Sequence, residues 1–154
     1  MGRGLLDRGL RGFPGVRAGW HDGRMHRRVE VHGSAPLPEA WDRYERYDAW
    51  PGWAPHIRRV EADGPRIRPG ARGTVHGYGG LRLPFRIDAV DATARTWSWT
   101  VWALGRPLRL RHDLVAADGG TRAGVDLEGP ALLVAPYAPF TRWPLHRLVR
   151  RAGG

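Results

Sequence analysis

The chain contains no cysteine, lysine, asparagine or glutamine. The lack of cysteine excludes both a disulfide framework and a thiolate metal site. No apolar run approaches the ~18 residues of a membrane-spanning helix. The basic N-terminus also lacks the continuous apolar stretch of a signal peptide. We therefore expect a cytoplasmic protein, and its 154 residues predict one domain with a sizeable core.

Positive charge is abundant, yet every cationic side chain is an arginine and the net charge is +10 at pH 7. A basic total favours a nucleic-acid partner when the charges gather in a patch or follow a known motif. Here the arginines are spread along the chain, and the absence of lysine points to codon bias in a GC-rich bacterial genome. We predict no nucleic-acid partner.

The first 24 residues differ from the rest of the chain. They are rich in glycine and arginine and show little periodicity, so we predict a flexible N-terminal extension over residues 1–24. Met25 stands directly before the first strand-like run, and we hypothesise that it is the natural start of a single domain over residues 25–154. Mass spectrometry of the native protein tests this, because an intact Met1 terminus would exclude it.

Alternation of apolar and polar residues predicts six to seven strands. The candidate strands cover residues 27–35, 57–63, 71–79, 81–90, 95–104, 107–117 and 121–129. Tight-turn residues such as Gly79-Gly80 and Asp118-Gly119 separate neighbours, which indicates an antiparallel sheet. Several strands present one apolar and one charged face, so one side of the sheet should be solvated. The facing of the strand that contains His76 is left open.

Helical spacing is found on both sides of these strands. Residues 36–47 predict a helix, and residues 49–56 predict a second short helix that Asp48 could cap. Residues 135–151 predict a C-terminal helix with one apolar face, begun or kinked by its prolines. The order of elements predicts an α+β helix-grip fold, in which a curved antiparallel sheet wraps around a long C-terminal helix.

Four segments carry a resemblance to a known family. They read PEAWDRYERYDAWPGWAPHIRRVE, GARGTV, LPFRIDAVDATARTWSW and GGTRAGVDLEG, and a basic helix follows them. With these segments the sequence resembles the SRPBCC superfamily (the START-like or birch-pollen-allergen fold), in its polyketide cyclase/dehydrase branch, over about residues 27–151. The resemblance implies an apolar cavity between sheet and C-terminal helix. Some members bind lipids, hormones or quinones there, and a minority cyclise or dehydrate polyketides.

Inward-facing aromatic and aliphatic residues are expected to line this cavity. The candidates are Trp50, Trp53, Tyr78, Leu83, Phe85, Ile87, Trp97, Trp99, Leu110, His112, Val125, Tyr137 and Phe140. Two interpretations of Trp50 and Trp53 stay open. Their burial would contribute roughly 1.5–3 kcal/mol each as plain core, or Trp53 would contact a ligand at the pocket mouth.

His112 is the candidate for chemistry, because it shares a strand face with leucines. Burial lowers the pKa of a histidine, so His112 would be either a neutral group satisfied within the fold or a general base. Scattered histidines predict no metal site, and neither Ser34 nor Ser98 lies in a nucleophile elbow. The family pattern gives no arginine that we can assign to catalysis.

We therefore expect the protein to bind a small hydrophobic or amphipathic molecule, such as a lipid, polyketide or quinone-like compound, without a cofactor. The alternative is an enzyme of the polyketide cyclase/dehydratase kind that uses His112 and a tyrosine for general acid/base chemistry. Homodimerisation is left open.

Overall fold

The computed structural model describes residues 23–152, so the predicted extension lies outside the described residues except for its last two positions. The first strand, β1, begins at Arg24, one residue before the expected domain start. The Ala131 N–H donates a hydrogen bond to the Gly23 carbonyl, and this bond ties Gly23 to the fold. The hypothesis that translation starts at Met25 stays a prediction.

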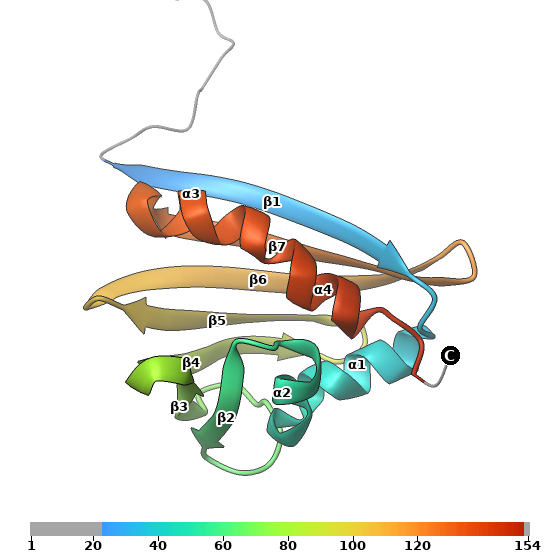
Figure 1. Ribbon diagram of the computed structural model, residues 1–154. Coiled ribbons are helices and arrows are strands. Elements are labelled where there is room, and N and C mark those ends of the chain that lie inside the picture. Colours follow the sequence, from blue (N-terminus) through green and yellow to red (C-terminus); the bar gives the residue numbers. More distant parts are fainter. Residues whose placement is uncertain (1–22, 153–154) are drawn as a thin grey trace, which may run out of the picture.

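Seven antiparallel strands form one curved sheet, as the alternation predicts (Figure 1). Their order in the sheet is β1-β7-β6-β5-β4-β3-β2. The bounds are β1 Arg24–Gly33, β2 Ile57–Ala62, β3 Arg72–Gly77, β4 Arg82–Asp91, β5 Thr96–Ala103, β6 Arg106–Ala117 and β7 Gly120–Pro130. Neighbours from β2 to β7 follow one another along the chain, and β1 closes the row beside β7.

Helices cover one face of this sheet. They are α1 Leu37–Glu45, α2 Trp50–Trp53, α3 Ala131–Phe140 and α4 Arg142–Leu148, with short 3-10 turns η1 Tyr47–Ala49 and η2 Tyr78–Gly80. Figure 1 shows α3 and α4 lying in line along the sheet, with α1 and α2 together near the end of α4. The sheet thus grips the C-terminal helical segment, and the predicted helix-grip architecture is confirmed.

The C-terminal helical segment differs in detail from the expected single helix. It begins at Ala131, four residues earlier than predicted, and is divided at Thr141 into α3 and α4. Prolines 136 and 139 lie inside α3 and Pro144 lies in the first turn of α4. Proline donates no backbone hydrogen bond and crowds the preceding turn, which accounts for the division of the segment near Thr141.

Trp50 and Trp53 have a local structural role at the end of α1. The last four carbonyls of a helix have no partner within the helix. Here the Trp50 indole N–H donates to the Tyr44 carbonyl, and the Trp53 indole N–H donates to the Arg43 carbonyl, each over 3.0 Å. The two rings on the short α2 therefore cap α1 with their polar edges while their apolar faces enter the core.

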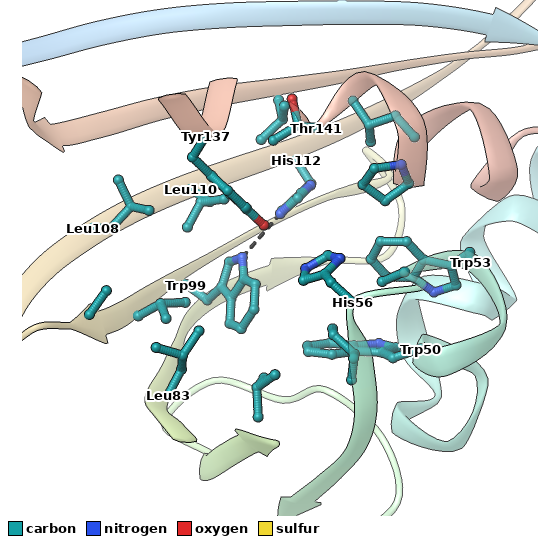
Figure 2. A pocket seen from close by; sticks show the side chains of 18 of the residues that line it. Trp50, Trp53, His56, Leu83, Trp99, Leu108, Leu110, His112, Tyr137 and Thr141 are labelled. Carbon is teal, nitrogen blue, oxygen red and sulfur yellow. Dashed lines mark hydrogen bonds between the residues drawn. The ribbon is translucent and has the colours of Figure 1, made fainter. Parts of the chain in front are cut away.

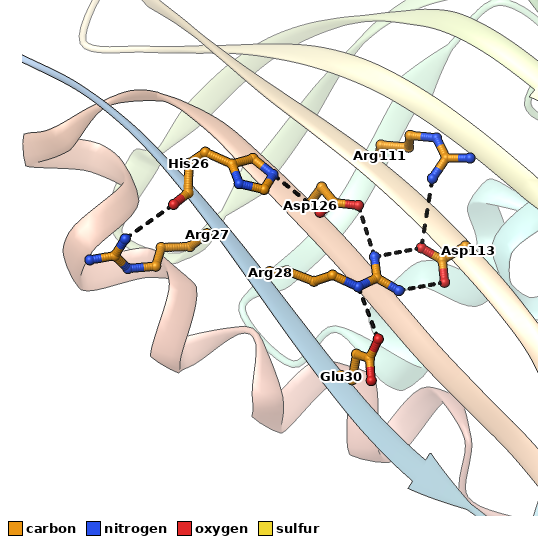
Figure 3. Close-up of polar contacts among 7 residues, drawn as sticks. All are labelled: His26, Arg27, Arg28, Glu30, Arg111, Asp113 and Asp126. Carbon is orange, nitrogen blue, oxygen red and sulfur yellow. Dashed lines mark hydrogen bonds and ion pairs between the residues drawn. The ribbon is translucent and has the colours of Figure 1, made fainter. Parts of the chain in front are cut away.

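The outer face of the sheet carries the charges that the alternation predicts (Figure 3). The Arg28 guanidinium on β1 contacts Asp113 on β6 at 2.9 and 3.0 Å and Asp126 on β7 at 2.8 Å. It also contacts Glu30 at 2.9 Å. A Cβ at Gly124 would lie 2.4 Å from Nη2 of Arg28, so only glycine lets the guanidinium cross β7 to reach Asp113.

Two local expectations are wrong. Alternation along residues 81–90 places Ala89 on the same face as Phe85 and Ile87. A register shift between Ile87 and Ala89 instead turns Ala89 to solvent and packs Val90 against the core. A bulge of this kind inverts the alternation beyond it. Asp48 was expected to cap the second helix, but its carboxylate instead pairs with Arg46 at 2.8 Å, and Ala49 stands at the cap position.

Candidate functional site

An apolar pocket of about 270 Å³ lies between the inner face of the sheet and the helices α2, α3 and α4. Figure 2 shows side chains from all these elements converging on it. The lining residues are Trp50, Trp53, Ala54, His56, Ile57, Val75, Leu81, Leu83, Trp99, Val101, Ala103, Leu108, Leu110, His112, Val125, Leu133, Tyr137, Thr141, Pro144 and Leu145. None of these lining side chains carries a full charge at neutral pH, apart from the two histidines when protonated.

A cluster of aromatic rings forms one wall of the pocket. Trp50 is fully buried, and its ring centroid lies 5.2 Å from that of Trp99, 5.6 Å from Trp97 and 6.0 Å from Phe85. The ring centroid of Tyr47 lies 5.2 Å from that of Trp50. Such edge and tilted contacts add about 0.5–1.5 kcal/mol per pair beyond burial. The wall is therefore rigid, and it keeps Trp50 and Trp99 in fixed positions beside the cavity.

His112 is held neutral by burial and by two hydrogen bonds. The Trp99 indole N–H donates to Nε2 of His112 over 3.0 Å, so Nε2 acts as acceptor and the proton lies on Nδ1. Nδ1 then donates to the Tyr44 hydroxyl over 3.3 Å. The imidazole also stacks on Trp97 at 4.5 Å. Burial lowers the pKa of His112 to about 3, so the ring is neutral throughout the physiological range.

Two other polar side chains, His56 and Tyr137, line the pocket. Nδ1 of His56 is buried without a hydrogen-bond partner among the described residues, and burial lowers the pKa of this side chain. Burial raises the pKa of Tyr137 to about 12, so its hydroxyl is neutral. Figure 2 shows this hydroxyl pointing into the pocket. The His56 and Tyr137 rings lie 6.3 Å apart, so one ligand could contact both.

Most of the predicted cavity residues lie together around this pocket. Those on its lining are Trp50, Trp53, Leu83, Trp99, Leu110, His112, Val125 and Tyr137. The alternation of apolar residues along β5, β6 and β7 places Trp99, Leu110, His112 and Val125 on the inner face, because the sheet is regular there. Their contact with a ligand stays a prediction.

The remaining predicted cavity residues lie elsewhere. Phe85, Ile87 and Trp97 are buried in the core but do not line the pocket, because the aromatic cluster fills that space. Phe140 is half-buried and packs on the His56 ring at 5.1 Å. Tyr78 is 66% exposed in η2, where the Arg58 guanidinium lies over its ring, so the expectation of an inward position is wrong.

Sequence reasoning missed several lining residues and left one strand undecided. His56 follows Pro55 in a turn, where no periodicity reveals which way a side chain points. Leu133 belongs to the part of α3 that was not predicted as helix. On β3, Val75 faces the pocket, whereas His76 points to the other face, buried beside Glu61 with Nε2 3.4 Å from its carboxylate.

Two further features, a cluster of metal ligands and a membrane-spanning helix, are absent among the described residues. Within residues 23–152 no group of three or more His, Asp or Glu side chains is placed to hold a metal ion. In the same range no helix is both long and apolar enough to cross a membrane.

A curved antiparallel sheet that grips a C-terminal helical segment, with short helices after its first strand, defines the helix-grip fold of the SRPBCC superfamily, that is, the START-like or birch-pollen-allergen fold. Comparison with solved structures supports this fold. The chain superimposes on Ara h 8.0201 with a TM-score of 0.67 and 18% identity, covering 82% of this chain and 95% of that one. It matches DynU16, from the dynemicin biosynthetic locus, with a TM-score of 0.68 and 20% identity.

The DynU16 match covers 83% of this chain but only 46% of DynU16. A third structure, protein CV1439 from Chromobacterium violaceum, matches with a TM-score of 0.61 and 14% identity over 80% of this chain and 94% of that chain. No family model and no curated protein sequence matches. At these identities the likeness establishes the fold alone.

Proposed function

We propose that the protein binds a small, neutral, largely apolar molecule of two fused rings in its internal pocket. The observation that carries the proposal is the pocket itself, with its volume of about 270 Å³ and its apolar lining. An apolar protein cavity of about 150 Å³ accepts benzene. The pocket is roughly twice as large, which suits a naphthalene-sized ring system.

The polar groups of the lining indicate which substituent the ligand carries. The Tyr137 hydroxyl and the His56 imidazole on the lining can exchange hydrogen bonds with a hydroxyl or carbonyl oxygen. No lining residue offers a permanent positive charge to an anion, and burying an unpaired charge is costly. A phenol or quinone therefore fits better than a carboxylate. The occurrence of DynU16 in a biosynthetic locus is in keeping with a small organic ligand.

The geometry around His112 disfavours the alternative of a cyclase or dehydratase. A general base needs a free lone pair within reach of the substrate proton. Here the only lone pair of the neutral ring accepts the Trp99 indole N–H, and Nδ1 is bonded to Tyr44. Among the pocket-lining residues no carboxylate could replace it, and the His56 imidazole is the one remaining base. We therefore propose binding without turnover by His112, which instead fixes the orientation of Trp99.

The experiment is a titration of the protein with 2-naphthol, in which isothermal calorimetry measures the binding. A ligand of about ten non-hydrogen atoms, at roughly 0.6 kcal/mol per atom, binds with a Kd of tens of micromolar. Replacing Val125 by phenylalanine fills part of the pocket, and we expect Val125→Phe to weaken binding by at least about tenfold.

The matched control is Val115→Phe, because Val115 is half exposed on β6 and does not line the pocket. This variant should bind 2-naphthol as the native protein does. Absence of binding to the native protein, or equal weakening in both variants, contradicts the proposal. Conversion of 2-naphthol by the native protein, and its loss in a His112 variant, would instead restore the enzyme alternative.

A further inference from the structure

One end of the molecule exposes leucines where the pocket reaches the surface. Leu104 is 91% exposed, Leu132 87% and Leu81 51%, and Leu81 also lines the pocket. They lie at the β5–β6 turn, at the start of α3 and beside η2. Figure 1 shows these three elements at the same end of the molecule. We call Leu81, Leu104 and Leu132 the leucine tip.

The backbone at Leu104 is held in a conformation that leucine disfavours. Ala103 pairs with Arg106, which leaves Leu104 and Gly105 as a two-residue hairpin loop with φ of 52° and 72°. Positive φ at both loop positions is typical of a type I′ turn, which favours Asn-Gly or Asp-Gly. The β6–β7 hairpin has the same pair of positive φ values with Asp118-Gly119.

Leu104 therefore makes no evident contribution to folding. Its side chain is almost fully in water, and its backbone lies in the left-handed region that a branched side chain disfavours. Local strain together with an exposed apolar side chain is best explained by a contact outside the monomer.

The charges around the leucine tip indicate what kind of surface it contacts. Arg58, Arg82 and Arg106 are exposed on β2, β4 and β6 at the strand ends nearest to the tip. Between residues 23 and 152 no carboxylate pairs with any of the three, whereas many other arginines of the sheet are paired. Apolar tips ringed by unpaired arginines match the interface of an anionic bilayer, where leucines enter the acyl boundary and arginines meet headgroups.

We propose that the leucine tip docks the protein on an anionic lipid surface, with Leu104 and Leu132 inserted and the pocket mouth facing the lipid. A second copy of the chain is a poorer occupant, because a symmetric contact would bring the same unpaired arginines of both copies together. Docking does not require the proposed ligand to be correct. If both hold, an apolar ligand would enter the pocket directly from the lipid.

The experiment measures cosedimentation of the full chain with phosphatidylcholine vesicles that contain or lack phosphatidylserine. We expect binding to the anionic vesicles only, and a loss of about tenfold in affinity for Leu104→Asn, because one inserted leucine is removed. Asparagine suits the type I′ turn, so the variant should unfold at an equal or higher temperature. Loss of vesicle binding then cannot be ascribed to loss of the fold.

Controls come from the opposite end of the sheet, where Val115 and Arg122 face each other across β6 and β7. Arg106→Gln should weaken vesicle binding about fivefold, whereas Val115→Asn and Arg122→Gln should leave it within twofold. The proposal is overturned if the native chain does not bind, or if tip and control variants bind equally. It is also overturned if sedimentation without lipid reveals a dimer that Leu104→Asn dissociates, since the tip would then join two copies.

Discussion

The neutral state of His112 makes the stability of the protein depend on pH in a calculable way. Its pKa is about 3 in the folded chain and 6.5 in the unfolded chain. Between these values the unfolded chain binds a proton that the folded chain excludes, so the free energy of unfolding falls as the pH falls. From about pH 7.5 to about pH 5.0, this one side chain removes about 2 kcal/mol of stability.

The perturbation that isolates this effect is His112→Gln, measured by urea unfolding at both pH values. Glutamine keeps an acceptor for the Trp99 indole N–H but does not titrate. The variant will be less stable than the native protein at pH 7.5, because its hydrogen bonds are poorer. Its further loss between pH 7.5 and pH 5.0 should nevertheless be smaller than the native loss by about 2 kcal/mol.

Two observations complete the test. His146→Gln changes an exposed histidine on α4 and should leave the native pH dependence intact. Nitrogen NMR of the native protein at pH 5 should show His112 neutral with its proton on Nδ1. An equal loss of stability in the native protein and in His112→Gln, or a protonated His112 at pH 5, would refute the reasoning about its hydrogen bonds and burial.

Further substitutions at Gly73, Gly52, Arg28 and Tyr137 have outcomes that the structure fixes. Gly73→Ala should cost more than about 2 kcal/mol in thermal unfolding, because a Cβ there would lie 2.2 Å from a backbone oxygen and 2.6 Å from a core ring. Gly52→Ala, where a Cβ meets open space, should be neutral or stabilising. Arg28→Met should lower the free energy of unfolding by about 1 kcal/mol at low salt and by less at high salt. Arg27→Met should change it little, and equal effects of the two substitutions would contradict the ion-pair network. Tyr137→Phe should lower the calorimetric affinity for 2-naphthol about fivefold and leave the affinity for naphthalene unchanged. Equal weakening of both affinities would contradict the proposed hydrogen bond.

The sheet could be predicted from the sequence because its side chains obey a period of two. Leu108, Leu110 and His112 share the inner face of β6 as the alternation indicates, and Trp97 and Trp99 do so on β5. These strands pair without interruption, so position in the sequence translates directly into position on the sheet.

The expectations that failed lie where regularity ends. A bulge after Ile87 changes which residues of β4 face inward, and no residue type at that point of the sequence predicts the bulge. Tyr78 follows the last residue of β3, so the alternation of that strand no longer governs it. The pocket boundary was also beyond sequence reasoning, because whether Trp97 or Trp99 touches the cavity depends on how the rings pack together.

The rings that surround Trp50 have a consequence for how ligand preference can change. Trp50 shares contacts with Phe85 and Trp97, which never reach the cavity, and with Trp99, which does. Close-packed interiors transmit small displacements rather than absorb them. Substitutions hidden behind the wall can therefore reshape the space offered to a guest molecule, and variants selected for new guests should carry changes at positions that no guest touches.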